Sequence, residues 1–270
     1  MKLNISLSPE VLFNIGWFPV TNSFIWTLVL SLFLIVTTIV IGKKLKMIPG
    51  GTQNFVELII EESYSFVKSI IGTDEKAKKV FPLVFTMFLL ILLANLATFI
   101  PGQAAISIAK ENGPVPLFRA VMADYGLVFV LTIITVVLTQ IIAIIVSGPF
   151  GYIGRFINLS GIKAFFKEAI HGKFKFGVLA QGFLDLFLGI MDIVGEIAKI
   201  ISLSFRLFGN IFAGEVLGGV MLFLAPFFTP LPFMFLGIIT AIVQAFVFAV
   251  LTLIFITMAI ETGEKQEGAA

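Results

Sequence analysis

The chain has 270 residues, of which 59% are hydrophobic and only 13% are charged, and its net charge is +2. Soluble domains carry roughly 25% charged residues, so this composition excludes an ordinary soluble protein and predicts an all-α, polytopic membrane protein. The small net charge gives no indication of nucleic-acid binding. Cysteine is absent and His171 is the only histidine, which argues against disulfides, thiolate metal sites and histidine-based chemistry. No cofactor and no metal are expected.

Five apolar runs are separated by polar segments that contain proline or glycine. The runs cover residues 24–41, 80–100, 125–146, 182–224 and 233–260, with an N-terminal segment over 1–20 and a polar tail over 261–270. We expect a single membrane domain over 1–270. Within it, 80–146 forms a helical hairpin, and 182–260 forms a second and longer hairpin.

The segment over 50–72 differs from the five runs because charges interrupt it. Its apolar residues recur at helical spacing, but Glu57, Glu61, Glu62 and Lys68 lie between them. This pattern predicts an amphipathic helix that is too polar to span a bilayer. The helix could lie in the membrane interface or cover part of the bundle, and the two interpretations are compatible.

The basic residues indicate the orientation of the chain. Most of the 18 Lys and Arg residues fall in segments 42–79 and 147–182, and few fall in the N-terminal segment or the loop over 101–120. Because basic loops remain in the cytoplasm, the N-terminus is expected outside, in the periplasm, and the C-terminus in the cytoplasm. His171 lies in a basic loop, where a solvated histidine is expected rather than a pH sensor.

The run over 182–224 is too long for one ordinary span. It contains no proline over its length, and as a single helix it would extend about 64 Å, twice the ~30 Å thickness of the hydrocarbon layer. It therefore forms either two helices or one strongly oblique helix.

Ionisable residues in this run follow a regular spacing. Asp185, Asp192, Lys199 and Arg206 are seven residues apart, so on a helix they form one stripe. Asn210 continues the stripe. The run contains two further carboxylates. Glu196 can pair with Lys199 three residues later, and Glu215 lies on the face opposite Arg206. A solvated helix entry or internal ion pairs are an equally good interpretation of Asp185 and Lys199.

Arg206 is the most informative residue of the chain. A charge at the bilayer centre costs at least ~2.5–3.5 kcal/mol, and an arginine does not lose its proton in a protein. No carboxylate lies three or four residues away, and the last run offers only Gln244 as a polar residue at comparable depth. We therefore expect the acidic partner of Arg206 on another protein. Small residues around it, such as Gly209 and Gly214, suit close packing against either that protein or this chain's own last run.

The block Ser202-Leu-Ser-Phe-Arg206-Leu-Phe-Gly-Asn210-Ile-Phe-Ala-Gly-Glu215 closely resembles the signature of the a subunit of F-type ATP synthases. The block Gln244-Ala-Phe-Val-Phe-Ala-Val-Leu-Thr252 resembles the second signature of that family. The resemblance implies a stator subunit packed against the ring of c subunits, held by the b subunits of the peripheral stalk, with two aqueous half-channels. It also implies that 182–260 forms a tilted hairpin along the ring.

The resemblance also assigns roles to single residues. Arg206 matches the arginine that meets the c-ring carboxylate, and Asn210 and Gln244 match polar residues beside and facing it. Glu215 matches a carboxylate of the periplasmic half-channel, and Asp192, with Glu196 near it, falls on the cytoplasmic access path. Gly237 stands where some members have a histidine, so the partner of Glu215 is expected to be different or absent.

The resemblance therefore implies a proton-translocating subunit of the bacterial inner membrane. No Gly-x-x-x-x-Gly-Lys-Ser/Thr motif occurs, so the chain is not expected to be the enzyme that handles ATP. The alternative is a secondary transporter in which Arg206 binds an anionic substrate, although no internal repeat supports it. A third possibility is an assembly subunit that conducts nothing, which leaves the cost of Arg206 and Glu215 unexplained.

Overall fold

The structure is a computed structural model that describes residues 9–100, 106–110, 113–147, 176–224 and 228–267. It confirms the helical membrane class. The elements in chain order are β1 (Val11–Ile15), β2 (Phe18–Thr21), α1 (Asn22–Lys43), α2 (Gly51–Ile71), α3 (Asp74–Ala97), β3 (Ser107–Lys110), β4 (Gly113–Pro116), the 3-10 helix η2 (Val121–Ala123), α4 (Tyr125–Ser147), α7 (Phe176–Leu224) and α8 (Pro230–Glu267).

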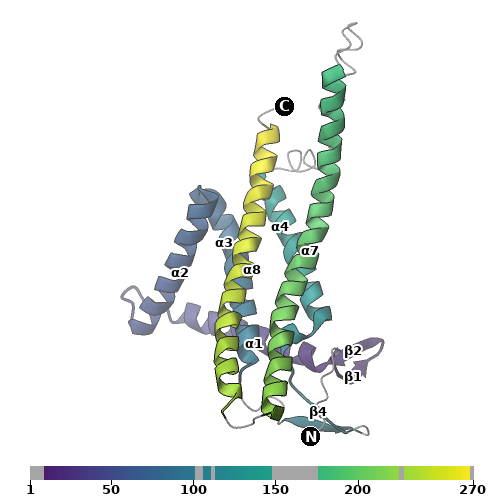
Figure 1. Cartoon of the computed structure of the whole chain (residues 1–270). Coiled ribbons are helices and arrows are strands. Elements are labelled where there is room, and N and C mark those ends of the chain that lie inside the picture. The colour runs from purple at the N-terminus through teal and green to yellow at the C-terminus, as the bar shows by residue number, and fades with distance from the viewer. Residues whose placement is uncertain (1–8, 101–105, 111–112, 148–175, 225–227, 268–270) are drawn as a thin grey trace.

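Four helices form the body of the molecule. Figure 1 shows α3, α4, α7 and α8 running side by side, with α2 leaning away on one side and α1 crossing behind the lower end. Helices α1, α3, α4 and α8 are long and apolar enough to cross a membrane. The chain is therefore a multi-pass membrane protein.

Helix α7 resolves the alternatives left open for the long run. It is one continuous helix of 49 residues, about 73 Å long, and it forms a hairpin with α8 whose turn lies at the lower end of the molecule (Figure 1). Helix α8 continues to Glu267, past residue 260 where the apolar run ends. The polar tail is thus mostly the last turns of a helix.

Helix α8 is the centre of the bundle because small residues let its neighbours approach. Ala241, Ala245 and Ala249 are all buried and lie four residues apart on one face of α8. One buried cluster joins Ala245 and Phe248 to Leu203 and other residues of α7, and a second joins Ala249 and the following turns of α8 to α2 and α3. Small side chains at four-residue spacing are typical of closely packed membrane helices.

Two short hairpins lie at the lower end, where the sequence predicts only turn-rich segments. Strands β1 and β2 are antiparallel and turn through Gly16, whose φ of 62° is favourable for glycine. Strands β3 and β4 form the second hairpin within the predicted loop. Period-two alternation over four or five residues is too short a signal to stand out from irregular loop sequence.

A buried polar cluster holds this end together. The Ser23 hydroxyl donates to Asp124 Oδ2 at 2.5 Å, and Asp124 Oδ1 accepts from the backbone N–H of Gly126 at 3.0 Å. Asn22 Nδ2 donates to the carbonyl of Pro116 at 3.3 Å. Asp124 therefore caps α4 and ties it to the first turn of α1. The segment over 116–124 is fixed in place by contacts on both sides.

An ion-pair cluster fixes the corner at the opposite end between α2 and α3. Asp74 Oδ1 lies 2.9 Å from Lys68 Nζ, and Asp74 Oδ2 lies 2.7 Å from Lys78 Nζ. The Tyr64 hydroxyl also donates to Asp74 Oδ1 at 2.9 Å. Gly72, with φ of 85°, ends α2 in the left-handed conformation that glycine tolerates.

Candidate functional site

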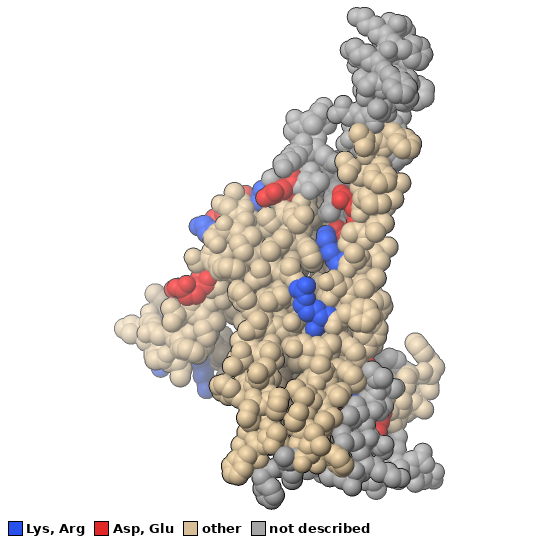
Figure 2. Space-filling model, viewed as in Figure 1, with Lys and Arg blue, Asp and Glu red and all other residues tan. Residues whose placement is uncertain are grey.

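The face formed by α7 and α8 carries the charged groups that lie away from the ends of the bundle. Figure 2 shows basic side chains partway down this face, with an uncharged surface below them. In the described part of the chain, α7 supplies two cations, Lys199 and Arg206. The structure places them in different surroundings.

Arg206 lies on the flank of α7. A stripe of buried side chains, Leu203, Leu207 and Ile211, attaches the helix to the core, and Arg206 points away from this stripe and is exposed. No hydrogen bond or ion pair joins Arg206 to any other residue that the structure describes. Asn210, one turn later, is half-buried. The arginine is thus presented outward, as the sequence predicts.

Lys199 is neutralised within the chain. Its Nζ lies 2.7 Å from Glu196 Oε1, which confirms the predicted pair, and both side chains are largely buried, at 16% and 15% exposure. Gln140 Nε2 of α4 donates to Glu196 Oε2 at 2.5 Å, and Lys199 Nζ lies 4.7 Å from the ring centroid of Phe255. Glu196 therefore joins α4 to α7, and the cation also rests on an α8 ring. Sequence reasoning assigns no role to Gln140 because its partner lies 56 residues away.

Asp192 lies one turn before this cluster and is half-buried. Its backbone position on α7 fits the predicted stripe, which runs from Asp192 through Lys199 to Arg206 along a single helix. Asp185 belongs to the same helix, but its side chain lies outside the described part of the structure, and so does His171.

Gln244 of α8 is one of two buried amides where α8 packs against α3. Its side chain is 8% exposed, and its Nε2 has no hydrogen-bond partner among the described residues. Asn95 of α3 is fully buried; its Nδ2 donates to the carbonyl of Ala241 at 3.2 Å, and its Oδ1 has no partner among those same residues. A buried polar atom without a partner costs about 1–3 kcal/mol. Two such atoms, Asn95 Oδ1 and Gln244 Nε2, therefore make this part of the apolar contact between α3 and α8 polar.

Asn95 was the polar residue that the sequence could have singled out. It stands alone in an otherwise apolar run, which is the same signal that identified Gln244. Only the packing of α3 against α8 shows that Asn95 donates to the carbonyl of Ala241, three residues before Gln244.

Glu215 lies on the other flank of α7, toward the lower end of the bundle. It is exposed, and the charge that acts on it is the guanidinium of Arg119. The ring of Phe99 fills the space beside Gly237, since a Cβ added there would meet Phe99 Cε1 and Cζ at 2.7 Å. Gly237 therefore offers Glu215 no side chain, and a different or absent partner for Glu215 stays a prediction.

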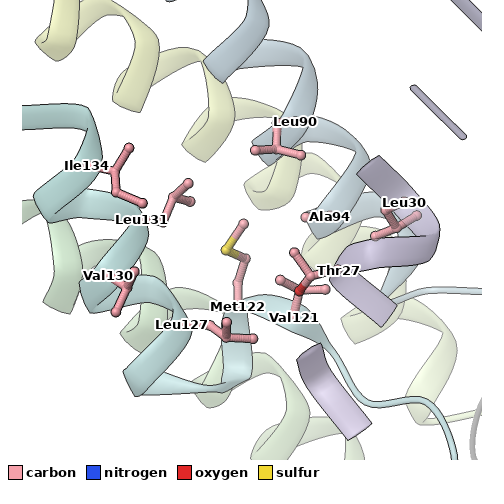
Figure 3. Close-up of a pocket in the computed structure, with 10 residues that line it drawn as sticks. All are labelled: Thr27, Leu30, Leu90, Ala94, Val121, Met122, Leu127, Val130, Leu131 and Ile134. Atoms are coloured by element: carbon pink, nitrogen blue, oxygen red, sulfur yellow. The ribbon is translucent and has the colours of Figure 1, made fainter. Parts of the chain in front are cut away.

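A cavity close to this end is unsuited to carrying protons. It has a volume of about 170 Å³. Figure 3 shows that aliphatic side chains of α1, α3, η2 and α4 surround it and that the Met122 sulfur points inward. Among the lining residues, Thr27 is the one with a hydroxyl group. Ordered water needs two to four polar partners. The polar groups of α7 lie outside this cavity.

The described residues contain no group of three or more His, Asp or Glu side chains that could hold a metal ion. The α7–α8 face offers instead the exposed cation Arg206 and two carboxylates elsewhere along α7, Asp192 and Glu215. Two buried amides, Gln244 and Asn95, lie where α8 packs against α3. A permanent cation at the position of Arg206 can stabilise an anionic group from outside the chain.

Comparison with known proteins gives a consistent picture. The family model for the ATP synthase A chain matches residues 23–257. A relative named ATP synthase subunit a from Syntrophobacter fumaroxidans is 32% identical over 94% of this chain and 91% of its own length. Proteins of the same name from Moorella thermoacetica and Geotalea daltonii are 29% and 32% identical, over 92% and 87% of this chain and 94% and 86% of their own lengths.

Proposed function

Since the chain belongs to the ATP synthase A chain family, a membrane-sector subunit, we propose that it conducts protons between two half-channels and exchanges charge with a ring of c subunits through Arg206. The observation that carries this proposal is the exposure of Arg206 without a partner among the described residues. A permanent cation placed in an apolar bundle is stabilised when a carboxylate from another protein reaches it.

The physical roles follow from charge and lipid exposure. A ring carboxylate next to Arg206 is stabilised in its ionised form by the opposite charge. Carrying that negative charge away into lipid would be costly, so the ring moves on only after a proton has neutralised the carboxylate. The fixed charge of Arg206 also repels protons and separates the two half-channels. A proton crossing 100 mV supplies about 2.3 kcal/mol, which biases the direction of rotation.

We assign the remaining polar groups to the routes on either side. Gln244 and Asn210 line the position next to Arg206, and Glu215 belongs to the route that opens at the lower end in Figure 1. Asp192 and Glu196 belong to the route from the other end. By the distribution of basic residues, the lower end faces the periplasm of a bacterial inner membrane and the C-terminus faces the cytoplasm. The b subunits would hold this stator against the ring. ATP chemistry belongs to other subunits.

The proposal is tested by Arg206→Ala in the whole ATP synthase in inverted membrane vesicles. We expect complete loss of ATP-driven proton uptake, with the subunit still present in the purified complex. Lys79→Ala is the matched control, because it removes a cation from an exposed ion pair with Glu75 at the start of α3, and it should leave uptake unchanged. Coupled uptake that persists in Arg206→Ala would overturn the assignment.

A further inference from the structure

Glu215 lies on the flank of α7 that faces the start of α4. Phe208 and Phe212 are stacked on this flank with ring centroids 5.2 Å apart, and Tyr125 meets Phe208 edge-on at 5.5 Å. Glu215 follows Phe208 by seven residues and Phe212 by three, so it continues the same row of side chains along the helix. This row of side chains on α7 therefore lies beside Tyr125, at the start of α4, and near the segment that precedes it.

That segment is held firmly against α7. Ala120, Val121, Met122 and Ala123 are all buried, in the same cluster as Leu207 and Ile211 of α7. Ile211 lies one turn before Glu215, so the segment packs on α7 beside the glutamate. The hydrogen bonds of Asp124 to Ser23 and to the start of α4 fix its far end. We therefore expect the residue just before Ala120 to lie at a fixed position near Glu215.

Arg119 occupies that position, and its side chain is half-buried. We propose that Arg119 is the positioning counter-charge of Glu215, holding the carboxylate at the lower flank of α7 where protons enter from that side. The proposal rests on the proposed function, since it gives Arg119 a task in the same outer route. Arg119 positions Glu215 and does not itself carry the proton, because its guanidinium keeps its own protons.

Gly237 and Phe99 explain why the counter-charge comes from this segment. The Phe99 ring lies against the Cα of Gly237, where a Cβ would come within 2.7 Å of it. Gly237 therefore presents no side chain at this position, and aromatic carbon occupies the space beside it. Another element can therefore supply the partner of Glu215, and the segment before η2, packed on α7, carries the cation Arg119.

The charge role is tested by proton-uptake rates of the whole complex in inverted vesicles. Arg119→Gln should slow uptake several-fold, and Arg119→Lys should keep most of the rate because it keeps the charge. Glu215→Gln should also slow uptake, and the double variant Arg119→Gln/Glu215→Gln should be no slower than the slower single variant. Lys79→Gln serves as the charge-removal control. Three results would overturn the pairing. They are a wild-type rate in Arg119→Gln, equal losses in Arg119→Gln and Arg119→Lys, and single-variant effects that multiply in the double variant.

A second measurement tests the pairing without relying on conduction. The chain has no cysteine, so Arg119→Cys/Glu215→Cys can be treated with a short bifunctional thiol reagent without background. We expect an internal cross-link in this variant and none in Arg119→Cys/Lys199→Cys, because Lys199 lies about 24 Å farther along α7. A missing cross-link at 119/215 would overturn the pairing. If it forms while Arg206→Ala still pumps, the pairing stands and the proposed function fails.

Discussion

Lys199 and Arg206 are two cations on one helix, seven residues apart, and the bundle treats them in opposite ways. Lys199 pairs with Glu196, which also accepts a hydrogen bond from Gln140, and it rests on the ring of Phe255. Glu196, Gln140 and Phe255 belong to three different helices. Arg206 is exposed and has no ion-pair partner in the described part of the chain. The first cation is therefore an internal fastening between helices. The second is a charge that the fold leaves available to a partner.

The chemistry of the two side chains matches these surroundings. A lysine ammonium is a compact charge that one carboxylate can neutralise and that one aromatic ring can further stabilise. An arginine guanidinium stays protonated and presents a planar fork of donors that suits an incoming carboxylate. Position on the helix does not distinguish the two residues, since a seven-residue step changes direction by only ~20°. The difference comes from which neighbouring helices reach each turn.

Arg206→Lys gives the largest expected effect because it makes the two cations chemically alike. The positive charge remains, but the fork of donors that can hold a carboxylate in two contacts is lost. We expect ATP-driven proton uptake in inverted vesicles to fall to background while the complex still assembles. Normal coupled uptake in this variant would show that a point charge is sufficient at this position.

Glu196→Ala should act on stability, in contrast to Arg206→Lys. Removing one partner of a buried ion pair costs about 3–5 kcal/mol when burial is complete, and the partial exposure of Lys199 reduces the expected loss to about 1–3 kcal/mol. Thermal unfolding of the purified complex would measure the change. Glu196→Ala/Lys199→Ala should recover part of the loss, because no unpaired charge then remains in the bundle. A double variant less stable than Glu196→Ala would contradict the internal-fastening role.

Asp74→Ala should have the smallest effect on stability, although Asp74 is joined to Lys68, Lys78 and Tyr64, and Glu196 to Lys199 and Gln140. Asp74 meets Lys68, Lys78 and Tyr64 at an exposed corner between α2 and α3, and exposed ion pairs are typically worth ~0–1 kcal/mol. We expect a loss of stability within that range, declining further as salt is raised, and unchanged proton uptake. A loss as large as that of Glu196→Ala would show that burial is not what separates the two ion-pair clusters.

Much of this architecture could be predicted from residue order. Apolar runs of bilayer length predict spanning helices whatever their neighbours are, because backbone polar groups must be paired within lipid. The charge of Arg206 in such a run predicts an external partner by the same argument. The pairing of Glu196 with Lys199 was also predictable, because residues three apart on a helix are neighbours.

Contacts between distant segments could not be predicted in this way. The hydrogen bond from Gln140 to Glu196 and that from Asn95 to Ala241 each join two different helices. The hairpins β1–β2 and β3–β4 were missed because strands of four or five residues carry too little periodicity.

The sequence by itself determined that this is a helical membrane protein carrying a permanent cation in an apolar helix, because hydropathy, charge and helical spacing are local properties. The tertiary structure decided which charges are neutralised internally and which are presented outward. That choice depends on which side chains from α3, α4 and α8 reach each turn of α7, and on the Phe99 ring that closes the position at Gly237. Electrostatic energy falls with distance, and distances between separate helices are set only when the bundle packs.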